Sequence, residues 1–381
     1  MSNKKPLLNR FYSNNLKRLV KPGKVLVIYG PRRVGKTTLV QNFLENYPGK
    51  YYQASGDDAQ LKTILESQQF SKIIPYFKDY DLVFIDEAQR INEVGLSLKI
   101  LVDQLPHLKI VVTGSSSFDL AGKIGEPLVG RQKIIQLHPL AVIELKDNYG
   151  AMYVKQNLEN LLIFGSYPEV ITAHSYQAKS EYLRQIRDSY LFKDILELQN
   201  IRNSKKILDL LRLIAFQIGQ EVSLQELGSQ LGLSKNTVGR YLDLLEKSFV
   251  LINIRGFSRN LRKEISKTSR YYFYDNGVRN AVINNFNLLP NRNDLGQLWE
   301  NFLLVERLKK NSYRNIDVNS YFWRTYRQQE IDLVEEKQGK LFAYEIKWAN
   351  NQVAIPSEWA KSYPQATFKV ITQDNFLDFI G

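Results

Sequence analysis

The sequence predicts an α/β fold that begins with a parallel β-sheet covered by helices. The apolar run Val25–Tyr29 leads directly into a glycine-bearing loop and a helical segment, and a second apolar run, Leu82–Ile85, ends in an acidic pair. Continuously apolar strands are typical of parallel sheets buried on both faces. A third observation, two strands around Gln338-Gly339, predicts a further α/β domain near the C-terminal end.

The composition indicates a globular protein of two or three domains. The chain has 381 residues, of which 44% are hydrophobic and 24% charged. No apolar run approaches the ~18 residues of a membrane-spanning helix, so no membrane association is expected. The absence of cysteine excludes thiolate zinc sites and cysteine nucleophiles. Without a signal-like apolar segment near the start, a cytoplasmic location is the expectation.

The net charge of +13 is unevenly distributed along the chain. Residues 25–150 carry 14 basic and 14 acidic side chains, whereas residues 1–24 carry seven basic and none acidic. Residues 202–270 carry 13 basic against 6 acidic side chains. The excess of basic residues thus lies outside the segment of the expected first sheet, as a polyanionic partner such as DNA would require. General solubility is the alternative explanation.

The loop after the first strand has the G-x-x-x-x-G-K-T spacing of a phosphate-binding loop. Its glycines allow backbone N–H groups to surround an anion, and the following helix adds its positive end. ATP is the expected cofactor, with Lys36 on the β- and γ-phosphates and the Thr37 hydroxyl on Mg²⁺. The expected ATP-binding residues are Gly30, Pro31, Arg32, Arg33, Val34, Gly35, Lys36, Thr37 and Thr38. The alternative is a β-to-α turn with a chance lysine.

The acidic pair Asp86-Glu87 follows the second apolar strand, fifty residues after Lys36. Ligands bind at the carboxyl ends of strands in such sheets. Asp86 is expected to hold Mg²⁺, and Glu87 to orient and deprotonate the attacking water. The pair therefore predicts hydrolysis, although an apolar run ending in Asp-Glu is also common at surface strand ends.

Two further sets of residues are candidates at the same site. The strand over residues 108–113 ends in small polar residues, of which Ser115 and Ser116 could contact the γ-phosphate or the attacking water. A serine-rich turn is the alternative. Arg131 could neutralise charge in the transition state, either in its own subunit or in a neighbour's site within a homo-oligomer, or it could be a solvated side chain.

The middle of the chain predicts a helix-turn-helix. Ser223 and Glu226 form a capping box at the start of a short helix, Gly232-Leu233 makes a turn, and Ser234 caps a second helix. Two strands near residues 249–254 and 269–274 would form a wing. The expected DNA contacts are Lys235, Asn236, Thr237, Arg240, Arg255, Arg259, Arg262 and Lys263. The alternative is a module that packs or docks against protein.

The C-terminal strands around residues 330–335 and 341–348 predict a hairpin in which paired residue numbers sum to 677. Asp332 would then lie opposite Glu345, and Glu330 opposite Lys347, on one face of the sheet. Two carboxylates and a lysine suit Mg²⁺ and a phosphodiester. Cross-strand salt bridging on an exposed hairpin is the alternative.

Four segments resemble one family. GPRRVGKTTL, LVFIDEAQRI, VVTGSSSFDL and the GR before HPLAVIEL are similar to the bacterial and archaeal ATPases of the AAA superfamily called archaeal-type or DEXX-box ATPases, and the similarity continues through the GSYPE segment at 165–169. The resemblance implies a core over residues 1–140, a helical lid over 141–200, a winged helix over 201–275 and a restriction-endonuclease-like domain over 276–381. Members are mostly of unassigned biological role.

The resemblance also implies roles in the last domain. Asp332, Glu345 and Lys347 match the Asp…Glu-x-Lys motif of restriction-like nucleases, in which the acids bind metal and the lysine orients water or stabilises charge. Glu300, on an expected helix, would be the additional carboxylate that many such enzymes have.

Three functions follow as hypotheses. The first is a DNA-associated ATPase that couples Mg-ATP hydrolysis to the nuclease-like domain. The second is a nucleotide-dependent regulator or scaffold with an inactive nuclease-like domain and a protein partner. The third, a small-molecule kinase, explains neither the Asp86-Glu87 pair nor the helix-turn-helix.

Overall fold

The computed structural model describes residues 8–115, 127–191, 204–258, 269–349 and 352–381. The chain divides into two compact units. One contains Leu7–Pro139 with Lys247–Phe249, and the other contains Leu140–Glu246 and Val250–Gly381. The first unit holds the phosphate-loop sequence, and the second holds the helix-turn-helix and the C-terminal strands.

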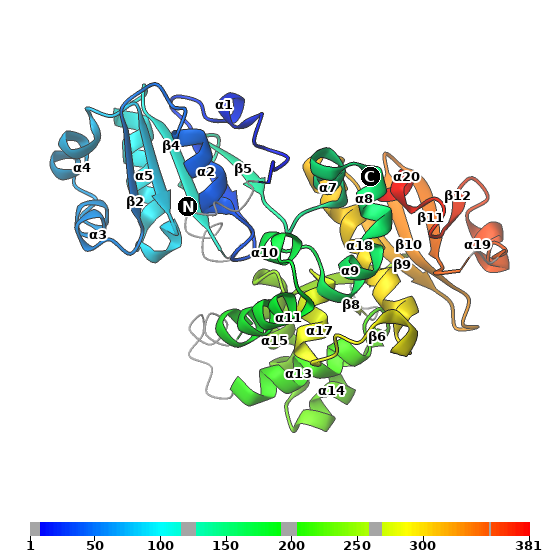
Figure 1. Ribbon diagram of the computed structural model, residues 1–381. Coiled ribbons are helices and arrows are strands. Elements are labelled where there is room, and N and C mark those ends of the chain that lie inside the picture. Colours follow the sequence, from blue (N-terminus) through cyan, green and yellow to red (C-terminus); the bar gives the residue numbers. More distant parts are fainter. Residues whose placement is uncertain (1–7, 116–126, 192–203, 259–268, 350–351) are drawn as a thin grey trace. The chain divides into compact units, whose positions relative to one another are not determined.

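The first unit contains a five-stranded parallel sheet with strand order β2-β3-β4-β1-β5. The parallel α/β core expected from the sequence is thereby confirmed (Figure 1). Its strands are β1 (Val25–Tyr29), β2 (Tyr51–Ser55), β3 (Leu82–Asp86), β4 (Lys109–Gly114) and β5 (Gln132–Gln136). Because all five strands run in one direction, the loops after β1, β3 and β4 leave the sheet at the same edge.

Helices cover this sheet. They are α1 (Leu16–Leu19), α2 (Lys36–Leu44), α3 (Ala59–Glu66), α4 (Phe70–Phe77) and α5 (Val94–Gln104), with a 3₁₀ turn η1 (Ala88–Arg90). Residues 59–77 form two helices, α3 and α4, rather than one. The division lies at Gln68, whose φ of 53° is incompatible with a continuous right-handed helix.

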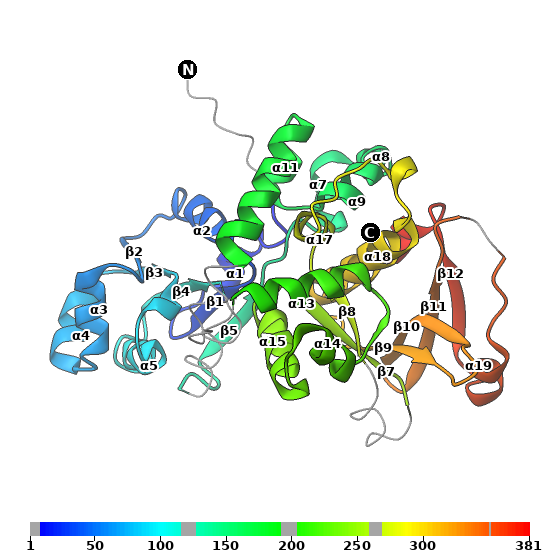
Figure 2. The same cartoon turned by 90° about the horizontal axis from the view of Figure 1, so that it is seen from below.

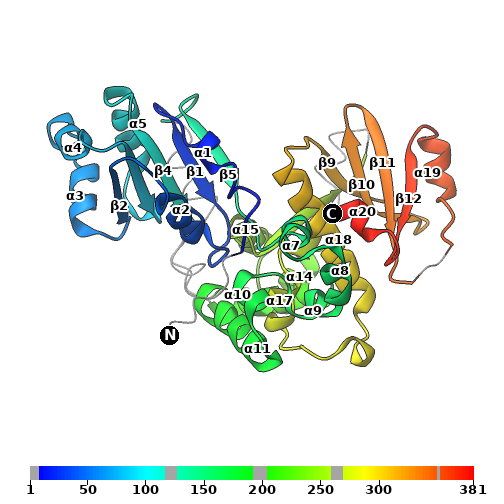
Figure 3. The same ribbon diagram turned by 45° about the horizontal axis from the view of Figure 1, so that its top comes forward.

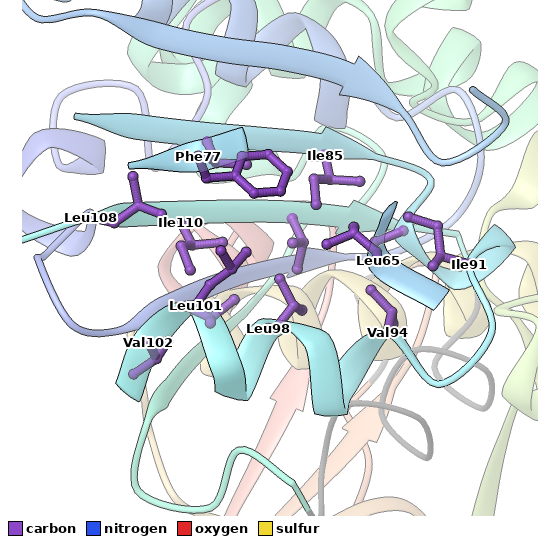
Figure 4. Packing of buried hydrophobic residues seen from close by; sticks show 14 of the residues in the cluster. Leu65, Phe77, Ile85, Ile91, Val94, Leu98, Leu101, Val102, Leu108 and Ile110 are labelled. Carbon is purple, nitrogen blue, oxygen red and sulfur yellow. The ribbon is translucent and has the colours of Figure 1, made fainter. Parts of the chain in front are cut away.

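One face of the sheet packs against α3, α4 and α5 (Figure 4). Alternate residues of three strands point to this face, among them Ile85 of β3 and Ile110 of β4, and Leu98 and Leu101 of α5 pack against them. All four side chains are fully buried. At about 25 cal/mol per Å² of apolar area removed from water, this cluster contributes a large part of the unit's stability. It holds the strand ends of the site in register.

The second unit is built on a seven-stranded mixed sheet with order β12-β11-β10-β9-β7-β8-β6. Its strands are β6 (Glu221–Val222), β7 (Leu251–Gly256), β8 (Ser269–Phe273), β9 (Asn319–Arg324), β10 (Glu330–Lys337), β11 (Lys340–Ile346) and β12 (Thr367–Ile371). The expected wing strands β7 and β8 join the C-terminal strands directly, because β7 pairs with β9. The sequence boundary expected near residue 275 therefore lies within one compact unit, and the boundaries between the four expected domains stay predictions.

The helices of this unit surround the sheet. They are α7 (Val142–Tyr149), α8 (Ala151–Gln156), α9 (Leu158–Phe164), α10 (Pro168–Thr172), α11 (Tyr176–Gln185), α13 (Ser204–Phe216), α14 (Leu224–Leu231), α15 (Lys235–Lys247), α17 (Asn276–Val282), α18 (Leu295–Tyr313), α19 (Ser357–Ser362) and α20 (Phe376–Ile380). A π-helical turn η2 (Ile186–Leu191) continues α11, and a 3₁₀ turn η3 (Leu289–Asn291) precedes α18. Figure 2 shows α13, α14 and α15 grouped together. In the described part of the chain, no helix is long and apolar enough to cross a membrane.

The helix-turn-helix elements lie where the sequence predicts them. Ser223 caps α14 by accepting from the Glu226 N–H at 3.3 Å, and Ser234 caps α15 by accepting from the Thr237 N–H at 3.1 Å. Gly228 permits the tight turn, since a Cβ there would lie 2.6 Å from the Leu233 carbonyl oxygen. The winged-helix assignment as a whole stays a prediction.

The predicted hairpin register is confirmed between β10 and β11. Leu333 pairs with Tyr344 and Lys337 with Lys340, so paired numbers sum to 677. Gln338 and Gly339 both have positive φ, 50° and 75°, as a two-residue type I′ turn requires. Figure 3 shows these strands beside β9 and β12, with α19 next to them. The register of β10 against β9 shifts between Ile331 and Val334, and this bulge contains Asp332.

The GSYPE segment lies in a buried polar network. The Ser166 N–H donates to Asp275 at 2.8 Å, and the Lys309 ammonium donates to the Ser166 hydroxyl at 3.1 Å and to Glu306 at 2.7 Å. A Cβ on Gly165 would collide with the Asp275 carboxylate at 2.0 Å. The segment therefore joins α9 and α10 to α17 and α18, which explains its composition structurally.

Candidate active site

The phosphate-loop sequence forms a tight loop between β1 and α2. Gly30 has a φ of 147°, and a Cβ there would lie 2.0 Å from the Leu137 carbonyl oxygen. Gly35 has a φ of 94° and is the N-cap of α2. Both positions require glycine, one for close backbone approach and one for its left-handed conformation. The loop therefore ends at a helix N-terminus, where backbone N–H groups suit an anion.

Lys36 lies inside this loop. Its side chain is 5% exposed, and its ammonium donates to the carbonyl oxygens of Gly30 and Pro31, both at 2.9 Å. Burial lowers the pKa of Lys36 to about 8, although the carboxylates of Glu87 and Asp86 act to raise it. A cation held by two neutral carbonyl groups is only partly compensated, so phosphate oxygens would be favoured neighbours.

Thr37 and Asp86, the expected magnesium ligands, lie in contact. The Thr37 hydroxyl donates to the Asp86 carboxylate at 2.9 Å, although 49 residues separate them in sequence. Oxygen ligands from one hydroxyl and one carboxylate, with the remaining positions open to phosphate and water, match the preference of Mg²⁺. These residues therefore fit the implied metal.

Glu87 is held by three neighbours from two strand ends. Gln89 and Ser115 both donate to its carboxylate, Ser115 at 3.1 Å, and the Gln89 amide also donates to the Ser115 hydroxyl at 3.0 Å. The Glu87 N–H donates to the Thr113 hydroxyl at 3.2 Å, and this hydroxyl donates in turn to Asp86. Glu87 itself adopts a left-handed conformation with φ 51°. Its carboxylate is thus placed beside the metal ligands by a hydrogen-bonded set.

Thr113 and Gln89 belong to this site and are absent from the sequence-based candidates. β4 extends to Gly114, so Thr113 is the last polar side chain of the strand adjacent to Asp86. A hydroxyl residue at the end of an otherwise apolar strand was the available signal. Ser115 contacts Glu87, as a residue at the water position would, whereas Ser116 lies outside the described residues.

Arg10 connects the N-terminal segment to the loop. It is 8% exposed, and its guanidinium donates to the carbonyl oxygens of Val34, in the loop, and His138, at 2.6 Å, after β5. The Val34 carbonyl is thereby tied to Arg10. In the sequence, Arg10 is one of seven basic residues before the first strand, and nothing local distinguishes a buried arginine from an exposed one.

Arg131 lies at the wrong end of the sheet to serve the site of its own chain. It precedes β5, its carbonyl accepts from the Val25 N–H at 2.9 Å, and its guanidinium pairs with Asp103 at 2.7 Å. The loop follows the other end of β1, roughly 16 Å away for five residues at about 3.3 Å each. Of the alternatives left open for Arg131, this geometry argues against action within its own subunit, because parallel pairing of β5 with β1 places the start of β5 at the opposite end of the sheet from the loop.

The remaining loop side chains differ in exposure. Val34 and Pro31 are buried, Arg32 is half-buried, and Arg33 and Thr38 are exposed. Arg32 is close enough to Lys36 to lower the pKa of that ammonium. Arg33 has a φ of 61°, so the loop turns at this residue.

The expected DNA contacts on α15 reach solvent. Lys235, Asn236 and Arg240 are exposed and Thr237 is half-buried, and Arg255 on β7 is exposed. Arg259, Arg262 and Lys263 lie outside the described residues. The first turns of α15 thus present two cations and an amide on one helix end.

The nuclease-like residues come together in the second unit. The Lys347 ammonium pairs with Glu345 at 2.7 Å, and Asp332 accepts from the Ile346 N–H at 2.8 Å. Glu300 accepts from the Tyr272 hydroxyl at 2.7 Å. Burial and the charge of Asp332 raise the pKa of Glu300 to about 8 and that of Glu345 to about 7, and burial raises the pKa of Asp332.

The arrangement of these acids does not fit the implied metal. Among the described residues, no three acidic or histidine side chains converge with metal-binding geometry. One oxygen of each of Glu300, Asp332 and Glu345 is engaged by a donor of the chain itself, whereas the second Glu345 oxygen is buried without a hydrogen-bond partner among the described residues. The assignment of Asp332 and Glu345 as a metal-bound pair therefore stays a prediction.

The AAA domain family matches residues 22–146, the segment that contains the loop, Asp86 and Glu87. This segment is similar to AAA-type, P-loop domains. Two domains of unknown function match the rest, DUF8612 at residues 155–289 and DUF4143 at residues 295–369. The AAA-superfamily resemblance is thereby confirmed for the first unit.

Similar proteins in other organisms are uncharacterised. One from Mycobacterium tuberculosis is 27% identical over 335 residues, covering 87% of this chain and 72% of the relative. Another from Methanocaldococcus jannaschii is 26% identical over 376 residues, covering 93% and 81%. The similarity spans both units, so the AAA domain and the second unit occur together in these relatives.

Two solved structures are similar at a low level. AMPPCP-bound DnaA from Aquifex aeolicus has a TM-score of 0.31 and 16% identity, covering 62% of this chain and 85% of that chain. A signal transduction ATPase with numerous domains from Pyrococcus horikoshii has a TM-score of 0.30 and 14% identity, covering 80% and 46%. At these scores neither carries functional weight.

Proposed function

We propose that this protein hydrolyses ATP with Mg²⁺ at the carboxyl edge of the first sheet. The observation that supports it best is the 2.9 Å contact between Thr37 of the loop and Asp86 of β3, with Glu87 adjacent. In this proposal, the phosphate-binding loop, the metal ligands and the carboxylate base follow strands that are far apart in sequence. A nucleotide-storing protein needs no such base.

The residues have separable roles in hydrolysis. The backbone N–H groups at the start of α2 and the Lys36 ammonium bind the β- and γ-phosphates. Bound Mg²⁺ supplies charge neutralisation at these phosphates, with Thr37 and Asp86 as its protein ligands. Glu87 accepts a proton from the water that attacks the γ-phosphorus, as the bond between that phosphorus and the ADP oxygen breaks. Gln89 and Ser115 orient Glu87 before the substrate arrives.

ATP hydrolysis by purified Glu87→Gln tests this proposal. Loss of the base should reduce turnover by ~10²–10⁴-fold while ATP binding is retained. Glu93→Gln is a matched control, because Glu93 is exposed, lies in the same connection and also has a positive φ, 48°. Lys36→Ala should abolish binding. Full turnover by Glu87→Gln, or normal ATP binding by Lys36→Ala, would contradict the assignment.

The second part of the proposal is association with DNA, coupled to the nuclease-like domain. The exposed cations at the start of α15 and the 13-to-6 excess of basic residues over 202–270 support it. Phosphate contacts release counterions, so DNA stimulation of ATPase activity should fall steeply with salt. Arg240→Ala should reduce the slope of log DNA affinity against log salt concentration by about one unit. Lys99 is an exposed cation of the first unit, so Lys99→Ala should leave this slope unchanged. ATPase activity that changes with neither added DNA nor salt concentration would remove DNA from the proposal.

The second candidate is a nucleotide-dependent regulator or scaffold with a protein partner. The poor fit of Glu300, Asp332 and Glu345 to a metal favours it. Within a homo-oligomer, Arg131 could still act at a neighbour's site, since its position excludes only its own. Cleavage of DNA by the full chain, lost in Asp332→Ala, would decide for the nuclease and against this candidate.

A further inference from the structure

Basic residues are concentrated at the amino end of the first sheet, the end opposite to the phosphate-binding loop. In the sheet order β2-β3-β4-β1-β5, a basic residue directly precedes or begins each strand except β3. These residues are, in the same order, Lys50, Lys109, Lys24 and Arg131. Figure 4 shows Leu108, the neighbour of Lys109, at the end of the sheet opposite to Ile91. Although residues 25–150 are neutral as a whole, folding therefore gathers cations along one edge of the sheet.

Strand register places these residues in a row. Because β1 pairs with both β4 and β5, Lys24, Lys109 and Arg131 occupy neighbouring positions. Lys109 pairs with Leu82 of β3, and Leu82 pairs with Tyr51 of β2. Adjacent strands lie about 4.8 Å apart, so the row crosses the whole sheet and is about 19 Å long. Phosphates of an extended nucleic-acid strand could contact several of its cations at once.

Two acids at this end of the sheet are engaged by the chain itself. Asp81 accepts from the Lys50 N–H at 2.7 Å, and Asp103 of α5 pairs with the Arg131 guanidinium at 2.7 Å. The segment before β1 adds no acid and several exposed cations, which are Lys17, Arg18 and Lys21. The surface therefore has an excess of positive charge that a polyanion would complement.

Tyrosines lie among the cations at the β2 end of the row. Tyr51 is 41% exposed, and its ring lies edge-to-face with that of Tyr47 at a centroid distance of 6.4 Å. The Lys109 ammonium donates to the Tyr47 hydroxyl at 3.2 Å. The Lys50 ammonium lies 4.8 Å from the centre of the Tyr80 ring. These partners are neutral, so they leave the charge of the two lysines uncompensated, and the exposed ring beside them offers a stacking surface for an unpaired base.

We propose that the amino end of the first sheet binds a single strand of nucleic acid. Lys24, Lys50 and Lys109 contact its phosphates, and Tyr51 stacks on one of its bases. A duplex would present paired and stacked bases whose faces the ring cannot reach. The surface is distinct from the start of α15, for which DNA association is proposed above, and it needs no ATP hydrolysis. Either proposal can therefore fail without the other.

The test measures binding of a fluorescently labelled oligothymidylate by anisotropy, on the full chain without ATP. All variants carry Lys235→Ala and Arg240→Ala, which remove the exposed cations at the start of α15. This background should still bind the strand, and adding Lys24→Gln with Lys50→Gln should weaken binding at least ~10-fold at low salt. The same pair should reduce the slope of log affinity against log salt concentration by about 1.4, since each phosphate contact to a single strand contributes about 0.7.

Lys72→Gln with Lys99→Gln is the matched control, because these exposed lysines of α4 and α5 change the charge of the same unit by the same amount. Tyr51→Ser should weaken binding about 5-fold, whereas Tyr51→Phe, which keeps the ring, should not. All the substituted side chains are exposed, so these variants remove no buried contact.

Absence of binding by the background, or an equal loss of affinity in the control pair, would overturn the proposal. Tighter binding of a duplex that contains the same thymidylate strand would overturn it as well, because a duplex offers Tyr51 no base face. Unchanged affinity of Tyr51→Ser would have the same consequence. A loss confined to Lys24→Gln with Lys50→Gln and to Tyr51→Ser is the expected result.

Discussion

Lys36 is the residue whose chemistry depends most on its burial. Its pKa of about 8, set by desolvation against the pull of Glu87 and Asp86, lies well below that of a free lysine. The folded chain therefore binds fewer protons than the unfolded chain between about pH 8 and pH 10.5. The stability contribution of this residue is least favourable below pH 8 and improves as pH rises through that window.

The same shift predicts proton uptake on ATP binding. The phosphates raise the pKa of Lys36 again, so binding at pH 9 should take up a fraction of one proton that is absent at pH 7. Calorimetry in buffers of different ionisation enthalpy measures this number. Apparent affinity should also fall above pH 8, by up to ~10-fold per pH unit. Equal proton numbers at pH 7 and pH 9 would show that Lys36 is charged in the free protein throughout.

Thr113 provides a second prediction at the scale of one residue. Its hydroxyl contacts both Asp86 and the Glu87 N–H, so Thr113→Val removes one hydrogen bond from the half-buried Asp86 carboxylate and the one that Thr113 accepts from the Glu87 N–H. The cost should be ~1–3 kcal/mol of stability, with turnover reduced more than ATP binding because Glu87 loses its orientation. Thr113→Ser keeps the hydroxyl and is the control. Thermal unfolding and ATPase assays compare the two. Equal turnover by Thr113→Val and Thr113→Ser would show that the Thr113 hydroxyl does not orient Glu87.

At the scale of elements, the loop between β1 and α2 depends on a side chain from another segment. Arg10 holds the Val34 carbonyl and the His138 carbonyl, so it fixes the loop to the connection after β5. Glycine and a left-handed Arg33 leave the loop free to adopt several conformations without this contact. Order in the loop before ATP binds reduces the entropy that binding must remove.

Arg10→Ala should therefore weaken ATP binding about 10-fold, raising KM more than it lowers kcat. Arg10→Lys should recover part of the loss, because an ammonium can reach one carbonyl but not both. Arg18→Ala, an exposed arginine of the same segment, is the control. Equal KM values for Arg10→Ala and Arg18→Ala would show that the loop forms without Arg10.

At the scale of the whole molecule, the chain divides into two compact units. The AAA domain has its own parallel sheet and core, whereas the helix-turn-helix strands and the C-terminal strands share one sheet. Asn301 of α18 strengthens that union by pairing with both the N–H and the carbonyl of Phe273 on β8, at 2.7 and 3.0 Å.

Thermal unfolding should therefore show two transitions. Mg-ATP at 100 times its Kd should stabilise the AAA domain by about 2.7 kcal/mol and raise one transition only. Asn301→Ala should lower the midpoint temperature of the other transition by a few degrees, since it leaves the Phe273 N–H and carbonyl of β8 without their Asn301 partner. Three or more independent transitions would contradict the continuous sheet.

Local chemistry in the sequence determined many of the helices, turns and strand pairings of this protein. Glycine spacing, capping serines, continuous apolar strands and a two-residue turn are effects of neighbouring residues, so the loop, α14, α15 and the β10–β11 register follow from them. Asp86 and Glu87 were identified because they end a buried strand. Such features need no knowledge of distant contacts.

The tertiary structure alone decided what depends on distant contacts. The order of strands placed Arg131 at the far edge of the first sheet, and pairing of β7 with β9 joined two regions that the sequence treats as separate. Arg10 looks like other arginines in sequence, and only its burial and its two carbonyl contacts give it a structural role. The pairing of strands that are distant in sequence decides which charged side chains are buried next to one another. Neither this strand pairing nor the burial of a given side chain can be read from the spacing of neighbouring residues.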